Sequence, residues 1–159
     1  MNSLVIYFSK FGNTKLVAET IGEVLKGAGE IQITNSDELA AADFDGVDLV
    51  VMGSPTHKMN LPEAVRPLFA KLHRELLKGK LFAAFDTSYK MSWWLNHFTA
   101  SKRLSPKLRK LGGKGIVPPQ IFHVMEREGP LYDGELEHAK AWATLILDKS
   151  NDLSNSKDV

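Results

Sequence analysis

Apolar residues occur along the chain in two alternating arrangements: short continuous runs, and longer segments in which they recur every three or four positions. The continuous runs are typical of strands buried on both faces of a parallel sheet. The recurring positions are typical of amphipathic helices. Five strands are expected, at residues 4–8, 30–34, 47–52 and 81–85, and at 115–117 continued by 121–124 after Pro118 and Pro119.

Helical spacing predicts helices between and after these strands. Pro67 is expected to kink the helix that begins near Asn60, and Pro106 to split a long helical stretch. Alternating strands and helices indicate one α/β domain, a parallel sheet covered by helices on both faces. This domain is expected to span residues 1–148, and residues 149–159 to form a flexible polar tail. The expected helices are 17–28, a short acidic one at 37–42, 62–76, 92–111 and 135–147.

Composition narrows the classes of function. The chain has 159 residues, of which 43% are hydrophobic and 25% charged, close to the averages for globular proteins. Cysteine is absent and the five histidines lack ligand spacing, which argues against disulfides, thiolate nucleophiles and a metal site. The chain begins without a signal-peptide pattern and contains no long apolar run, so a cytoplasmic protein outside the membrane is expected.

Charge is uneven along the sequence although the net charge is only +1. That net charge gives no argument for nucleic-acid binding. Residues 37–48 contain acidic but no basic residues, and no acidic residue occurs between Asp86 and Glu126. Charged runs of this kind are usually the solvated face of a helix. The acid-free stretch contains Lys90, Lys102, Arg103, Lys107, Arg109, Lys110 and Lys114.

Three loops are candidates for chemistry, because ligands bind beyond the carboxyl ends of the strands in an open parallel sheet. The first loop follows the first strand and leads directly into a helix. Its hydroxyls, its amide and the free N–H groups of the helix start suit a phosphate monoester. A purely structural reading, in which Ser9 and Asn13 only cap the helix, is equally open. This loop consists of Ser9, Lys10, Phe11, Gly12, Asn13 and Thr14.

The other two loops follow the third and fourth strands and offer flat surfaces beside hydroxyls. Gly53 is expected to let the backbone approach a planar ligand. Aromatic side chains at the same sheet edge indicate a flat aromatic ring bound between the loops. The candidates are Pro55, Thr56, His57, Lys58 and Met59 after the third strand, and Asp86, Thr87, Ser88, Tyr89, Trp93 and Trp94 after the fourth.

In these three loops and in the order of its elements, the chain resembles the flavodoxin family over nearly its whole length. The segment ending Gly12-Asn13-Thr14 is the most specific match. The resemblance implies a flavodoxin-like three-layer sandwich with a five-stranded parallel sheet of order 2-1-3-4-5. It also implies that FMN places its phosphate on residues 9–14 and its ring between residues 54–59 and the segment from Asp86 to Trp94.

The sequence departs from the family at three points. Phe11 stands where many members have threonine, the fourth-strand loop lacks their Gly-Asp pair, and the chain lacks their strong acidity. The prediction is an FMN-binding redox protein that passes electrons to a partner protein or a small acceptor. A decayed flavin site acting as an interaction module and a small FMN-dependent reductase of a quinone-like acceptor are alternatives. No catalytic acid or base is identified, and cations near the flavin favour two-electron behaviour.

Overall fold

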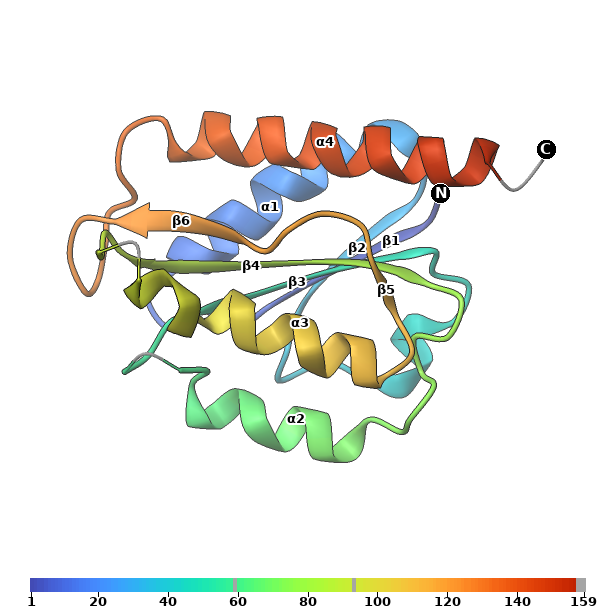
Figure 1. Cartoon of the computed structure of the whole chain (residues 1–159), viewed down its shortest axis with the longest axis horizontal. Helices are drawn as coiled ribbons and strands as arrows, with labels where there is room; N and C mark the ends of the chain where they lie inside the picture. The colour runs from blue at the N-terminus through green and yellow to red at the C-terminus, as the bar shows by residue number, and fades with distance from the viewer. Residues whose placement is uncertain (59, 93, 157–159) are drawn as a thin grey trace.

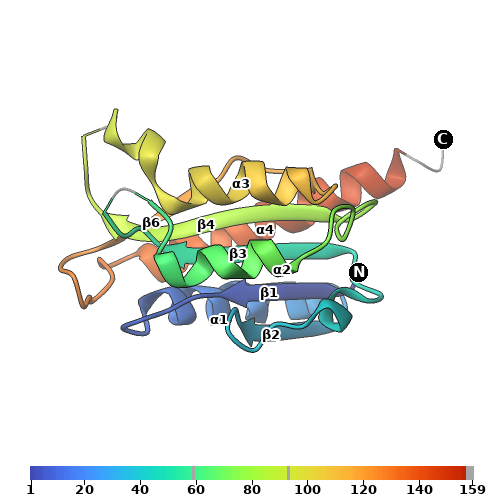
Figure 2. The ribbon, with the colours of Figure 1, turned by 90° about the horizontal axis from the view of Figure 1, so that it is seen from below.

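The computed structural model describes residues 1–58, 60–92 and 94–156. Its centre is a parallel sheet with the strand order β2-β1-β3-β4-β5, and β6 continues the outer position beside β4. The expected fold class and strand order are therefore confirmed. Figure 2 shows the strands side by side, with α2 and α3 in front of them. The strands are β1 Ser3–Tyr7, β2 Ile31–Asn35, β3 Leu49–Pro55, β4 Leu81–Tyr89, β5 Lys114–Gly115 and β6 Gln120–Val124.

Helices cover both faces of the sheet and form the two outer layers (Figure 1). α1 (Asn13–Leu25) and α4 (Glu135–Asn155) cover one face, and α2 (Arg66–Lys71) and α3 (Ala100–Lys110) cover the other. Short 3₁₀ turns complete the structure at Lys26–Ala28, Ala41–Phe44, Glu63–Val65 and Leu95–Phe98.

Alternation along each strand divides the core into two clusters. On β1, Leu4 and Ile6 pack with the α2 and α3 side, whereas Val5 packs with the α1 and α4 side. On β4, Phe82 belongs to the first cluster and Phe85 to the second. Because successive side chains point to opposite faces, a strand buried on both faces reads as a continuous apolar run.

The two prolines predicted to disturb helices lie within helices that they do not break. Pro67 lies in the first turn of α2, where its missing N–H is not needed, so the expected kink was wrong. Pro106 lies inside α3, and the predicted split was misplaced: the 3₁₀ turn ends at Phe98 and α3 begins at Ala100. The predicted helix over 62–76 is shorter, because the backbone at Leu72 is extended.

Three elements, β3, β4 and α4, extend beyond their expected C-terminal ends, β3 through Pro55. β4 continues through Tyr89, so residues 86–89 are strand rather than loop. α4 continues to Asn155 rather than ending at 147, and the hydroxyl of the buried Ser150 donates to the Ile146 carbonyl at 2.7 Å. The flexibility expected for residues 149–159 stays a prediction. No helix within the described ranges has the length and apolar character needed to cross a membrane.

Candidate functional site

A cavity of about 590 Å³ lies at the carboxyl end of the sheet, where β1, β3 and β4 end. β2 lies on one side of β1 and β3 on the other, so the order in which strands are added to the sheet reverses at β1. Open α/β sheets bind ligands at such a switch point. The volume is in the range of sites for small molecules and cofactors. Its lining includes Phe8, Ser9, Lys10, Phe11, Asn13, Thr14, Pro55, Thr56, His57, Lys58, Thr87, Ser88 and Tyr89.

The loop after β1 brings backbone N–H groups and a hydroxyl together at the start of α1. Gly12 has a φ of 94°, a left-handed conformation that glycine adopts without strain. Its carbonyl accepts the first helical hydrogen bond from the Leu16 N–H at 2.9 Å. The N–H groups of residues 13–15 therefore precede the first helical bond and have no acceptor within the helix. Ser9 Oγ accepts the Gly12 N–H at 3.0 Å, which leaves its own hydroxyl hydrogen available to a ligand.

Two threonine hydroxyls connect this loop to strand β4. The Oγ1 atoms of Thr14 and Thr87 lie 2.8 Å apart, both residues are buried, and both line the cavity. One hydroxyl donates to the other, so the accepting hydroxyl keeps a hydrogen that can be donated elsewhere.

Asn13 contacts a different part of the chain from the one its place in the loop suggested. Its amide nitrogen donates to the Glu128 carbonyl at 3.0 Å. A Cβ added at Gly129 would meet the Asn13 amide within 2.5 Å. The Asn13 side chain therefore fixes the segment after β6 against the start of α1.

Residues after β3 form the second wall of the cavity. His57 and Asn60 exchange backbone N–H donations at 2.9 Å, which turns the chain back on itself, and Lys58 between them has a φ of 47°. Gly53 has a different role from the expected one, because a Cβ there would lie 2.0 Å from the Phe85 ring. Glycine at 53 thus admits a core phenylalanine rather than a planar ligand.

Asp86 is a predicted site residue that does not line the cavity in the structure. It is fully buried, and Oδ2 accepts from both the N–H and the hydroxyl of Ser101. Thr56 donates its hydroxyl to Asp86 Oδ1 at 3.2 Å and accepts the Ala100 N–H at 2.8 Å. Asp86 in β4 and Thr56, which directly follows β3, thus cap the start of α3. Burial raises the pKa of Asp86 above its ordinary value of 3.8, and the hydrogen bonds from Ser101 lower it in part.

The aromatic residues of the predicted ligand loops do not all line the cavity. Tyr89 and Phe11 line the cavity and are 46% and 41% exposed, so a bound ring could cover them. Trp94 is 55% exposed and is not among the described residues that line the cavity. Met59 and Trp93 lie outside the described residues.

Several lining residues were missed by sequence reasoning. The missed residues include Phe8, Asn60, Leu61, Pro62, Glu63, Ala64, Arg66, Val124 and Arg127. Those at 60–66 lead into the 3₁₀ turn and the start of α2 that follow β3, and Val124 and Arg127 end or follow β6. Both segments lie beyond the carboxyl ends of strands, β3 and β6, and this position is the sequence signal that points to them.

Positive charge predominates among the described residues that line the cavity. Lys10, Lys58, Arg66 and Arg127 line it and are exposed, with Glu63 as the acidic lining residue. Lys10 Nζ lies 5.4 Å from the centre of the Phe11 ring. By contrast, Lys90 Nζ lies 4.0 Å over the Tyr132 ring, and Lys90 is not one of these lining residues. The loop donors and these cations together suit an anion attached to a flat apolar group.

The fold and the position of the cavity define an open α/β protein with a candidate ligand cavity at the switch point of the sheet. A model described as a flavodoxin domain matches residues 4–121, and the chain belongs to the flavodoxin family. It is 28% identical over 156 residues to a flavodoxin from Maridesulfovibrio salexigens, with 92% of this chain and 97% of the relative covered. A flavodoxin from Clostridium saccharobutylicum is 30% identical over 90 residues, covering 55% of this chain and 56% of the relative.

Solved structures share the fold at lower identity. Oxidised flavodoxin 2 from Bacillus cereus has a TM-score of 0.80 at 20% identity, with 94% of this chain and 99% of that chain covered. A flavodoxin from the domain Archaea has a TM-score of 0.72 at 23% identity, with 94% and 98% covered. Both matches support the assignment of the architecture.

Proposed function

We propose that the chain binds FMN in this cavity and passes electrons through it to a redox partner or a small acceptor. The phosphate would be held by Ser9, by Thr14 and by the N–H groups of residues 13–15. The ring would lie between the His57 segment and Tyr89. When bound, FMN supplies the electron chemistry, and the protein sets its position and its electrostatic surroundings.

The observation that carries this proposal is the juxtaposition of the donor-rich loop and the apolar cavity at one sheet edge. The loop offers hydroxyls and free N–H groups at a helix N-terminus, which favour a dianion. The cavity beside it has aromatic walls at Phe11 and Tyr89 and a volume of about 590 Å³. A phosphate alone would not require the aromatic walls, and a flat ring alone would not require the donor-rich loop. FMN contains a phosphate and a flat ring in one molecule.

The lining cations favour a second candidate, a small reductase that acts on a quinone-like acceptor. Lys58 and Arg66 lie on the cavity wall and are exposed, so they would stabilise negative charge on a reduced ring or on an incoming acceptor. A carrier and a reductase would differ in whether a diffusible quinone reoxidises the reduced protein catalytically. Steady-state turnover with a soluble quinone separates the two candidates.

Titration of the purified protein with FMN and with riboflavin, followed by flavin fluorescence, tests the proposal. FMN should bind, and riboflavin should bind at least tenfold more weakly because it lacks the group that the first loop is built to hold. Equal affinities would refute the phosphate assignment. Absence of binding by either compound would favour the alternative of an interaction module without a flavin.

A further inference from the structure

The surface formed by α3 and the aromatic turn before it is neither part of the cavity nor explained by the fold. α3 contains five cations and no acidic residue. Within residues 1–58, 60–92 and 94–156, no carboxylate lies within ion-pair distance of any of these five. The five are Lys102, Arg103, Lys107, Arg109 and Lys110.

Helix stability accounts for only part of this charge. Cations near a helix C-terminus interact favourably with the macrodipole, which suits Lys107, Arg109 and Lys110. Lys102 and Arg103 instead lie in the first turn, where the dipole disfavours positive charge. The helix dipole therefore does not account for the positive charge at these two positions.

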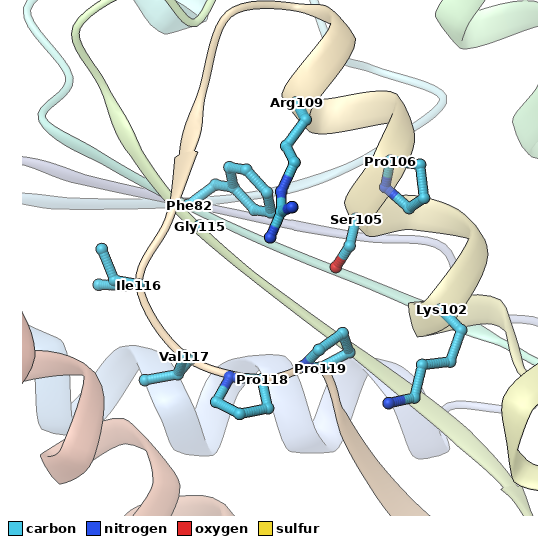
Figure 3. Close-up of a pocket in the computed structure, with 10 residues that line it drawn as sticks. All are labelled: Phe82, Lys102, Ser105, Pro106, Arg109, Gly115, Ile116, Val117, Pro118 and Pro119. Atoms are coloured by element: carbon cyan, nitrogen blue, oxygen red, sulfur yellow. The ribbon is translucent and has the colours of Figure 1, made fainter.

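Each side of α3 borders a groove. The first groove measures about 470 Å³ and lies between α3 and the 116–119 segment. Figure 3 shows Lys102, Ser105 and Arg109 on the helix side of this groove, with Phe82 between the helix and that segment. On the other side Lys107 and Lys110 border a groove of about 610 Å³ with an apolar wall that includes Phe69. Cations beside apolar grooves resemble the mixed polar and apolar character of protein docking surfaces.

Exposed aromatic residues continue this surface toward the cavity. Trp94 and Phe98 are 55% and 46% exposed, and the Arg103 guanidinium lies 5.9 Å from the centre of the Phe98 ring. Aromatic residues and arginine are the types enriched where proteins associate. The hydrogen bonds from α3 to Thr56 and Asp86 hold this surface close to the candidate site.

We infer that α3, together with Trp94 and Phe98, docks a partner protein whose contact surface is acidic. The charge distribution favours a folded protein over a polyanion, because the net charge is only +1 and residues 37–48, after the opposite edge strand β2, are acidic. Such asymmetry orients a compact partner and repels a long anion from the rest of the molecule. That the partner exchanges electrons rests on the proposed function, whereas its acidity rests on α3 alone.

Amide chemical shifts of the ¹⁵N-labelled protein, with and without FMN, test this docking surface. The probes are zinc-substituted rubredoxin as a small acidic protein, ferrous cytochrome c as a basic one, and a DNA duplex. The acidic probe should shift resonances of residues 94–110 in both forms, and added salt should weaken binding. Tighter binding of cytochrome c, or of the duplex at the same salt concentration, would overturn the inference, as would unshifted α3 resonances.

Charge-reversal variants make the test specific. Lys102→Glu with Arg103→Glu should weaken the acidic probe about tenfold or more, as expected for close charges at an interface. Lys26→Glu with Lys140→Glu makes the same charge change on the opposite layer and should have a much smaller effect. Equal weakening by both pairs would mean that net charge alone acts and would refute a localised surface. Thermal unfolding shows whether each variant is folded, and flavin absorbance of the same samples reports FMN binding separately.

Discussion

The hydroxyl oxygens of Thr14 and Thr87 lie 2.8 Å apart, although the two residues are 73 positions apart in the chain. This contact joins the start of α1 to the end of β4, and it lies on the wall of the candidate FMN cavity. The position of the proposed phosphate site relative to the proposed ring site therefore depends partly on two buried hydroxyl groups.

Replacing Thr14 with alanine should weaken FMN binding. The change removes one of the hydroxyls available to the phosphate and leaves Thr87 without its partner. A lost hydrogen bond to a charged group costs about 1.5–3 kcal/mol, or roughly a tenfold to hundredfold increase in Kd. Thr20→Ala is the matched control, because Thr20 donates within α1 to the Leu16 carbonyl and does not line the cavity. Fluorescence titrations giving both variants the same Kd would count against the assignment.

Replacing Gly12 with alanine should destabilise the first loop. With a φ of 94°, an L-residue there costs about 1–2 kcal/mol, and relief of that strain would move the N–H groups at the start of α1. We expect a lower free energy of unfolding and weaker FMN binding. Gly27→Ala is the control, since no atom lies within 4 Å of its added Cβ and its φ is not positive. It should raise stability by about 0.4–1 kcal/mol and leave Kd unchanged.

The expected fold followed from the apolar pattern because both faces of the sheet are covered. Strands β1 and β3 are continuous apolar runs for that reason, and the carboxyl ends of the strands then locate the cavity. The predicted C-terminal ends of β3 and β4 were wrong, because both strands continue further. Thr87 and Ser88 are buried in β4, yet three hydroxyl or carboxyl residues in succession read as a loop.

Asp86 shows why single site residues could not all be predicted. Its sequence position matches a cofactor loop, but its carboxylate is used by the Ser101 N–H and hydroxyl at the start of α3. That pairing depends on where α3 begins, and the sequence placed the break in this region at Pro106 instead of before Ala100. Such a role depends on a contact between two elements, here β4 and α3. The local spacing of residues in the sequence does not show which elements will be in contact.

Asp86 should make stability fall as pH rises in the acid range. Its folded pKa is raised above 3.8, so between 3.8 and that folded value the folded state binds more protons than the unfolded state. The free energy of unfolding should decrease through this window and level off above it. Asp86→Asn should lack this slope, as urea unfolding across a pH series measures.

The Ser101→Ala variant checks the cause of that slope. The Ser101 hydroxyl donates to Asp86 and lowers the pKa of that carboxyl, so its removal should extend the window to higher pH. A difference in the free energy of unfolding between wild type and Asp86→Asn that stays constant, or increases, as pH rises through this window would contradict the assignment.

Tyr89 rather than Trp94 should contact the flavin ring. Tyr89 lines the cavity, whereas Trp94 is not among the described residues on its wall. Stacking on an aromatic ring quenches flavin emission, so Tyr89→Leu should increase the fluorescence of bound FMN. Trp94→Leu serves as the matched variant and should leave that emission unchanged. The opposite ranking of the two variants in steady-state fluorescence would place the ring elsewhere.

Removing lining cations should lower the potential at which bound FMN accepts its second electron. Lys58 and Arg66 favour a negatively charged reduced ring, so Lys58→Gln with Arg66→Gln should make full reduction harder and increase the fraction of one-electron-reduced flavin. Screened charges at roughly 8–10 Å shift a potential by about 10–20 mV each. Lys90→Gln is the control, because Lys90 lies over Tyr132 and off the described cavity wall, and it should produce a smaller shift. Spectroscopic redox titrations at low and high salt measure both variants. An equal or larger shift in the control would show that a position on the cavity wall is not what gives a cation its effect on the flavin, and an unshifted potential in the Lys58 and Arg66 variant would show that these two cations do not act on it.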